Sequence, residues 1–463
     1  MPTPVYHTQV ALDAARCLLL AVIVTSIGWK IGGSLPRVLG PKRWALVIAP
    51  LCTPALLVSY TYASWALRLT GSPWLLNIFY SVLVGLKLIP LAVIARRMFP
   101  PMISREARFC ESLIKDRPWT ARLAFRREAL GAVPWFTGGL VFLLAFTDFE
   151  LASLLSVKTW AILLFDAHAG GLALPESLSR VIGPIAVELL IIALFLRPAG
   201  RMVFRTDAGP ETAVERRWVL PVLGAISAVM SFWPLVKIVG QSVTGWSLIS
   251  IRDVVGEEIL MSLATALVAT LAIWVVLLFI TRKITRLFLV LPGLLGALVL
   301  SLVLLAALKA APPFFLTSAS MQTEWAKRLW AIAESPLPLL VAEALLLAPV
   351  ALILRTLIAT RHPGEKLHLA RMAGSRRLIW DLALEPRAAA LGLLFLLSYF
   401  EFTAASILAP VQLTPVCVRL HNLAHYGQTA GLSAMLVSAM LAPAAVLALT
   451  LGGARFYARK DVR

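Results

Sequence analysis

Three carboxylates in apolar surroundings are the residues whose chemistry stands out first. Asp148 and Glu150 belong to DFELASLL (148–155), and Glu401 begins EFTAASIL (401–408). Because an ionised group inside a bilayer costs on the order of several kcal/mol, an acid in a membrane span is a functional candidate. These three can line a pathway and favour a cation such as ferric ion. Alternatively, each is a structural carboxylate capped by a neighbouring helix.

Two histidines, His421 and His425, have the i, i+4 spacing that can bind a metal ion. No third ligand follows nearby, and His168 occupies the place of His425 in a related upstream segment. A packing or gating role on an interfacial helix therefore competes with metal ligation, and we expect no cofactor. The four cysteines are scattered without a CxxC pair, which indicates neither a disulfide framework nor a zinc site.

The basic segment HLARMAGSRRLIWDLALEP (368–386) lies between two long apolar runs. Its small residues allow two short helices to meet closely, glycine gives the backbone freedom for a turn, and the final proline suits a helix start. Such a helix pair can dock on a partner; the alternative is a solvated basic connector. The residues that carry the pattern are His368, Ala370, Arg371, Ala373, Gly374 and Pro386.

The elements that hold these residues must be membrane helices. Hydrophobic residues make up 59% of the 463 residues and charged residues 14%, whereas an ordinary soluble protein has about 25% charged residues. Apolar runs of about 20 residues recur, and backbone groups in lipid must pair within a helix. The composition predicts an all-α polytopic membrane protein. No cationic segment precedes the first apolar run, so we expect no cleavable signal peptide.

Hydropathy predicts about eleven transmembrane helices. Their ranges are 16–33, 44–62, 74–95, 131–155, 179–197, 218–238, 258–281, 287–309, 336–356, 388–410 and 432–452. Alternate connecting segments hold 32 of the 43 basic residues, which places those segments in the cytoplasm, the N-terminus outside and the C-terminus inside. The net charge of +19 is thus a topology signal that suits contact with anionic membrane lipid, not with nucleic acid.

An internal repeat organises these spans. EFTAASIL follows DFELASLL by 253 residues, and AHAG (167–170) returns as AHYG (424–427). We therefore predict two parallel repeats of five spans plus a connecting span, which suits a central pathway. The predicted divisions are 1–217 for the first repeat, 218–257 for the connecting span and outer loop, and 258–463 for the second repeat.

The basic segment resembles the cytoplasmic coupling loop of binding-protein-dependent ABC importer permeases. Ala370 and Gly374 fall on the family's Ala and Gly positions, and Pro386 closes the loop at nearly the family's spacing, whereas His368 stands where Glu is usual. The following span, with its acidic-Phe pair, is also similar. Two units fused in one chain resemble the iron(III)-type and thiamine-type permeases, although the first loop, 111–134, has no clear glycine at the matching place.

The resemblance implies a transport subunit in a bacterial plasma (inner) membrane. Its implied partners are two copies of an ABC ATPase and an extracytoplasmic solute-binding protein, and its implied substrate is iron(III). The chain contains no G-x-x-x-x-G-K-[ST] pattern, so it is not expected to be an enzyme, and ATP hydrolysis would belong to the separate subunit. The alternative is an ion-coupled secondary transporter with parallel repeats, in which Asp148 and Glu401 would bind protons or sodium.

Overall fold

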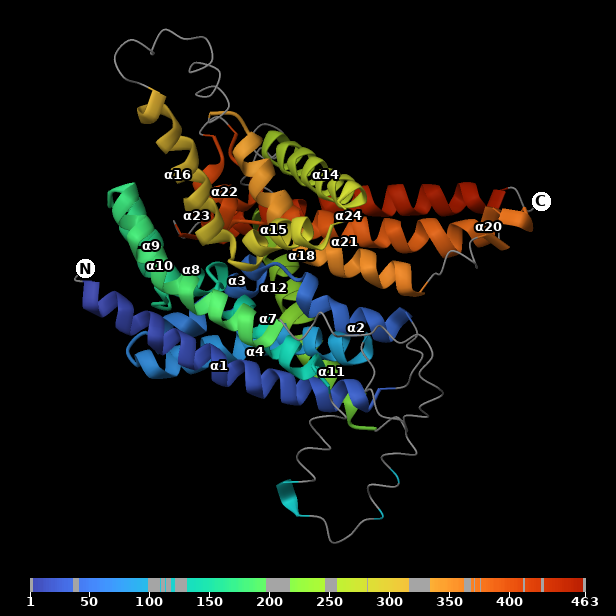
Figure 1. Ribbon diagram of the computed structural model, residues 1–463, viewed down its shortest axis with the longest axis horizontal. Helices are drawn as coiled ribbons and strands as arrows, with labels where there is room; N and C mark the ends of the chain where they lie inside the picture. Colours follow the sequence, from blue (N-terminus) through green and yellow to red (C-terminus); the bar gives the residue numbers. More distant parts are fainter. Residues whose placement is uncertain are drawn as a thin grey trace. The chain divides into compact units, whose positions relative to one another are not determined.

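Helix is the regular structure throughout the described part of the chain. The computed structural model describes residues 3–35, 41–98, 109, 113, 118–120, 131–196, 217–245, 256–280, 282–315, 334–361, 368–369, 371–374, 376–410, 413–425 and 429–460 (Figure 1). Within these residues no strand occurs. The prediction of an all-helical membrane protein is confirmed at this level.

Eight helical segments within the described residues are long and apolar enough to cross a membrane. They are Val5–Gly33, Pro73–Met98, Leu174–Phe195, Val219–Val243, Gly256–Phe279, Leu337–Ala359, Leu382–Tyr399 and Gly431–Gly452. Each overlaps a predicted span, although Leu382–Tyr399 covers only the first part of the predicted 388–410. The first is longer than predicted, because Asp13 and Arg16 form an ion pair at 3.0 Å and so remain inside the helix.

Two further predicted spans are bent pairs of helices. Helix α2 (Pro41–Cys52) meets α3 (Ala55–Leu69) at 74°, and α15 (Lys283–Leu294) meets α16 (Ala297–Phe315) at 107°. Pro54 lies in the first break, where it lacks a backbone donor and disfavours helix in the residue before it. Gly296 lies in the second break with φ +79°, a conformation that favours glycine. We predicted continuous spans at both places.

The predicted spans 131–155 and 388–410 are also interrupted. Helix α7 (Val133–Phe146) is followed by α8 (Glu150–Leu154), and α21 (Glu385–Tyr399) by α22 (Thr403–Leu408). At 14 residues, α7 is shorter than the helices that can cross alone. The described residues therefore give eight spans, or ten if each bent pair counts as one, and the number eleven stays a prediction.

The chain divides into two compact units, and the predicted repeat divisions 1–217, 218–257 and 258–463 stay a prediction. Unit 1 comprises Met1–Thr53, Trp65–Asp148 and Ala186–Trp233. Its helices are α1 (Thr3–Gly33), α2, the end of α3, α4 (Pro73–Met98), α7, the end of α10 (Leu174–Ile191), η1 (Ile192–Leu196), α11 (Val219–Ser227) and η3 (Ala228–Phe232).

Helix α1 packs on α4 and α7, and a Cβ placed on Gly28 would lie 2.4 Å from the Cβ of Ala92. Glycine thus allows the close approach of α1 to α4.

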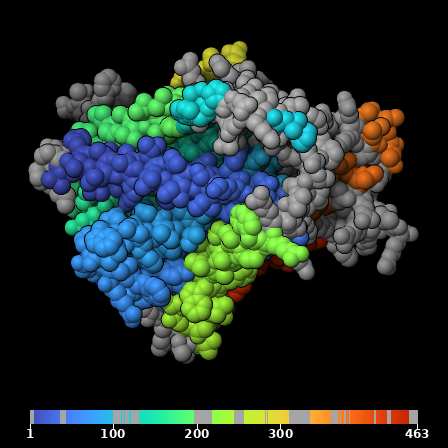
Figure 2. All heavy atoms as spheres, turned by 90° about the horizontal axis from the view of Figure 1, so that it is seen from below, coloured from blue at the N-terminus to red at the C-terminus, as the bar shows by residue number. Residues whose placement is uncertain are grey.

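Helix α1 also has a large exposed apolar face. Leu12, Leu19 and Val22 are each at least 60% exposed, and Figure 2 shows α1, in dark blue, as a continuous uncovered band. Exposed leucine and valine along a helix of membrane-spanning length are typical of contact with lipid.

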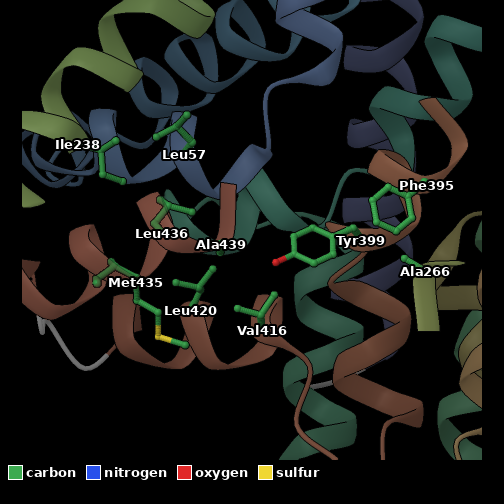
Figure 3. Close-up of a cluster of buried hydrophobic side chains, with 11 residues drawn as sticks. Leu57, Ile238, Ala266, Phe395, Tyr399, Val416, Leu420, Met435, Leu436 and Ala439 are labelled. Carbon is green, nitrogen blue, oxygen red and sulfur yellow. The ribbon is translucent and has the colours of Figure 1, made fainter. Parts of the chain in front are cut away.

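Unit 2 comprises Pro54–Ser64, Phe149–Ile185 and Pro234–Arg463. Its helices are the start of α3, α8, α9 (Trp160–Ala169), most of α10, α12 (Trp233–Gly245), α14 (Gly256–Phe279), α15, α16, α18 (Leu337–Arg361), α20 (Arg376–Ile379), η4 (Trp380–Leu384), α21, α22, α23 (Val416–His425) and α24 (Thr429–Lys460). One buried cluster gathers side chains from α3, α12, α14, α21, α23 and α24, among them Leu57, Tyr399 and Leu420 (Figure 3). This cluster supports the helices around the candidate site.

Candidate functional site

The helix breaks of unit 2 bring together two segments that the sequence matched to each other. Glu150 begins α8, and its Oε1 accepts a hydrogen bond of 3.0 Å from the backbone N–H of Phe402, just before α22. The rings of Phe149 and Phe402 lie nearly parallel, with centroids 5.9 Å apart and an interplanar angle of 12°. The acidic-Phe motifs of the two predicted repeats therefore touch through one hydrogen bond and one ring pair.

His421 extends this contact. Its ring stacks on Phe402 with a centroid distance of 4.2 Å, and its Nε2 lies 3.2 Å from the Oγ of Ser153 on α8. Burial, and secondarily the charge of His425, lowers the pKa of His421 to about 4. At neutral pH the imidazole is therefore uncharged and suited to stacking and to one hydrogen bond with Ser153.

A small pocket, with a cavity volume of about 20 Å³, lies beside this stack, within unit 2. Its lining is apolar except for three groups that can do chemistry, Glu150, Cys417 and His421. The Cys417 thiol donates to the carbonyl oxygen of Glu401 at 3.2 Å, and burial raises its pKa well above the usual value. The pocket thus presents a carboxylate, a neutral thiol and a neutral imidazole. The residues that line it are Pro54, Leu56, Glu150, Leu154, Phe400, Phe402, Cys417, Leu420, His421 and Leu436.

The predicted histidine pair does not gain a third metal ligand in the described part of the chain. The rings of His421 and His425 are parallel, 6.3 Å apart. No group of three His, Cys, Asp or Glu side chains suited to a metal ion occurs among the described residues. His168, which matched His425 in the repeat, has its Nδ1 3.1 Å from Ser177 Oγ. The arrangement favours packing over metal binding.

Asp148 lies in unit 1, in a network of polar side chains. The Tyr80 hydroxyl donates to its Oδ2 at 2.8 Å. The Arg16 guanidinium lies 5.0 Å from the centre of the Tyr80 ring, is paired with Asp13 and donates to Asn77 at 3.1 Å. Asp148 is thus held by a neighbouring helix, as the structural interpretation of this carboxylate expects.

Glu401 has a local role. Its Oε1 accepts a hydrogen bond of 3.2 Å from the backbone N–H of Ala404, which satisfies one of the free donors in the first turn of α22. All three predicted carboxylates therefore accept a hydrogen bond from the protein. Glu150 and Glu401 lie in unit 2 and Asp148 in unit 1, and a role in a pathway stays a prediction for each.

The predicted coupling segment contains the expected turn at Gly374, which has φ +63°. Helical hydrogen bonds precede it, since the N–H of Ala373 donates to Leu369 and that of Gly374 to Arg371. His368, Arg371, Ala373 and Gly374 are exposed, and Pro386 stands at the start of α21. Ala370 and most of the first basic loop, 96–130, lie outside the described residues.

Several residues that contact the predicted site residues could not be predicted from the sequence. Phe149 and Phe402 were visible as the matched Phe of each repeat, but nothing in the sequence told us that they stack on each other. Ser153 and Tyr80 gave no separate signal. Their contacts depend on which helices become neighbours, and a helix register is not readable from one sequence.

Besides Asp13, two more acids that lie outside the pocket are buried, Glu343 and Glu188. Glu343 is 4% exposed and accepts a hydrogen bond of 2.6 Å from Ser398. Glu188 is fully buried, and neither of its carboxylate oxygens has a hydrogen-bond partner among the described residues. An acid of this kind in a membrane helix is a functional candidate.

No protein-family model matches this sequence, and no curated protein or solved structure matches it significantly. The helices define an α-helical multi-pass membrane protein.

Proposed function

We propose that this chain is the permease subunit of an ATP-driven importer, with two permease halves fused in one polypeptide. The observation that carries the proposal is the recurrence of one order of elements. In the first half, α4 is followed by a basic segment, α7, a three-residue break, α8, α9 and α10. In the second half, α18 is followed by a basic segment that includes α20 and η4, then by α21, a three-residue break, α22, α23 and α24. Such recurrence supports a tandem duplication.

The strongest support for the duplication comes from the breaks between α7 and α8 and between α21 and α22. Helix α7 ends at Phe146 and α21 at Tyr399, and α8 begins at Glu150 and α22 at Thr403. Both offsets are 253 residues, the same as between DFELASLL and EFTAASIL. With equivalent segments in contact at Phe149 and Phe402, this junction is the proposed meeting point of the two repeats. The adjoining pocket would belong to the solute pathway.

The exposed segment around Gly374 supports the proposed partner. Leu369 and Met372 are 64% and 73% exposed, and Leu378, after the turn, is 47% exposed. Apolar side chains on a short exposed helix pair suit docking in a groove of another protein. In our proposal two ATPase subunits grip this segment and the first basic loop, while a solute-binding protein delivers cargo at the outer face of a bacterial plasma membrane.

The turn gives a direct test. Gly374→Val places a β-branched residue at φ +63°, where L residues are strained, although its Cβ would meet no atom within 4 Å. We expect loss of co-purification with an ATPase encoded beside this chain and loss of ATP-dependent uptake. Gly374→Asn, which tolerates this conformation, is the matched control and should retain both. Unchanged association and uptake in Gly374→Val would contradict the coupling role.

A second candidate, an ion-coupled secondary transporter, is favoured by Glu188. A fully buried carboxylic acid within a candidate span is a group that can carry a proton. If this candidate holds, uptake persists without ATP, collapses when the ion gradient is removed, and is lost in Glu188→Gln. Uptake that needs ATP and survives in Glu188→Gln would exclude it.

Iron(III) is the substrate that the family resemblance suggests. The carboxylates that favoured a cation accept hydrogen bonds from the protein, from Tyr80 to Asp148 and from Phe402 to Glu150. The proposal of iron therefore depends on the resemblance rather than on a ligand set. Ligand screening of the cognate solute-binding protein, with ferric ion beside small organic solutes, tests it directly, and failure to bind ferric ion would remove it.

A further inference from the structure

A column of five rings runs through the contact between the two matched segments. The ring of Phe165 on α9 lies 4.7 Å from that of Phe149, between centroids, and Phe149 lies 5.9 Å from Phe402. Phe402 stacks on His421 at 4.2 Å, and His421 lies parallel to His425 at 6.3 Å. This ring column joins α9 and the start of α8 to the start of α22 and to α23, all within unit 2.

The middle of the ring column is closed to water. Phe149 and Phe402 are 2% and 5% exposed, whereas Phe165 and His421 are half-buried. The centroid distances of 5.9 Å and 4.2 Å are typical of rings in contact. The cavity of about 20 Å³ beside the column has room for about one water molecule. A larger solute therefore cannot cross this place unless the rings separate.

The contacts of the ring column that join the two predicted repeats are weak ones. They are the ring pair of Phe149 and Phe402, the hydrogen bond from the Phe402 N–H to Glu150, and the contact of Ser153 with His421. A ring pair and two hydrogen bonds are weak enough to break and form again as a protein changes its conformation.

Each repeat also keeps a ring pair of its own. Phe149 packs on Phe165 in the first repeat, and Phe402 stacks on His421 in the second. If the repeats move apart, each of these four rings retains one aromatic neighbour. Phe149 and Phe402 stand directly before the short helices α8 and α22, beyond a break in each predicted span. Each short helix can therefore tilt without bending a long helix.

We propose that Phe149, Phe402 and His421 form a gate on the solute pathway. The gate is closed in this structure, and it opens when α8 and α9 move away from α22 and α23. Closely packed apolar rings exclude water, as the hydrophobic constrictions of channels do. The gate rests on the proposed function in that the pathway must run between the two repeats, but it requires neither ATP nor a particular solute.

The native Cys417 can report on this gate, because it lines the pocket and is 6% exposed. In a protein whose other three cysteines are replaced by alanine, its reaction rate is measured in intact cells. The probe is a small methanethiosulfonate that carries a trimethylammonium group and does not cross membranes. Phe149→Ala removes a ring that joins the repeats but does not line the pocket. We expect Cys417 to react about three- to tenfold faster in this variant, because loss of the ring pair raises the open fraction.

The matched control is Phe142→Ala, because Phe142 is also 2% exposed and stacks on Phe146 in unit 1. It should leave the reaction rate of Cys417 unchanged. Ser153→Ala removes the contact with His421 and leaves every ring in place. It should raise the rate about two- to threefold, and it tests the gate even if Phe149→Ala does not fold.

A second reporter separates opening of the gate from loosening of the whole protein. Cys17, which is 1% exposed in unit 1, should stay unreactive as the sole cysteine in Phe149→Ala. Equal rates for Cys417 in the unchanged protein, Phe149→Ala and Ser153→Ala would overturn the gate. Faster reaction of Cys17 together with Cys417 would also overturn it. These rates decide the gate alone, whereas the ATP dependence of uptake decides the ATPase partnership.

Discussion

Oε1 of Glu150 accepts a hydrogen bond from the backbone N–H of Phe402, which connects α8 to the start of α22. In Glu150→Ala that N–H loses its acceptor in a part-buried place, and we expect a loss of about 1–3 kcal/mol in the free energy of unfolding. Thermal or denaturant unfolding in detergent measures it. Glu150→Gln keeps a carbonyl oxygen at the same place and should lose less than half as much. Equal stability of Glu150→Ala and the unchanged protein would show that the bond is not formed.

His421 predicts a pH dependence of stability. Its pKa in the folded protein is about 4, below its ordinary value of 6.5, chiefly because it is buried. Between these two values the unfolded chain binds the proton and the folded chain does not, so stability falls as the pH falls from about 6.5 towards 4. Above about pH 7 this histidine contributes no slope.

Melting temperatures of the unchanged protein and of His421→Phe at pH 5 and pH 7.5 test this expectation. Phenylalanine can keep the stack on Phe402 but cannot take up a proton. We expect a smaller difference between the two pH values in His421→Phe. An identical difference in the two proteins would contradict the burial of a neutral His421.

At the scale of elements, Gly293 determines how α15 sits on α18. A Cβ at this position would lie 2.2 Å from the carbonyl oxygen of Leu345 and 2.9 Å from Cδ of Pro349. Gly293→Ala should therefore force the helices apart and cost about 1–3 kcal/mol, measured as a lower melting temperature. Gly224→Ala on α11, where no atom lies within 4 Å, is the matched control and should be neutral or stabilising. Equal melting temperatures would contradict the close approach.

The apolar runs predicted where the helices lie, but they predicted only some of the positions at which the helices end. Pro54 marks the break between α2 and α3, and proline is a readable signal. The break after Phe146 contains neither proline nor glycine. Its position depends on contacts such as that between Tyr80 and Asp148, and contacts between distant residues are not encoded in local hydropathy. Continuous spans were therefore predicted where the structure has breaks.

For the candidate site, the sequence predicted some of the residues but not their contacts. The sequence identified Glu150, Glu401 and His421 from their residue types, and His421 and Glu150 do line one pocket. It could not identify Ser153 or the ring pair of Phe149 and Phe402, which arise from packing between segments about 250 residues apart. Residue type indicates what a side chain can do, whereas its partners follow only from the tertiary fold.

For the whole molecule, the proposed function requires two halves with the same orientation in the membrane. Parallel repeats require both basic loops to lie on one side. Trp119 in the first loop and Met372 in the second are 72% and 73% exposed, and Gly71, in the predicted outer loop between α3 and α4, is also exposed. These three positions can each accept a single cysteine in a variant that lacks the four native ones.

The most direct measurement is labelling of Trp119→Cys, Met372→Cys and Gly71→Cys in intact cells with a maleimide that does not cross membranes. We expect Gly71→Cys to react in intact cells, and Trp119→Cys and Met372→Cys to react only after the cells are permeabilised. Reaction of Trp119→Cys and Met372→Cys from opposite sides of the membrane would contradict the parallel repeat.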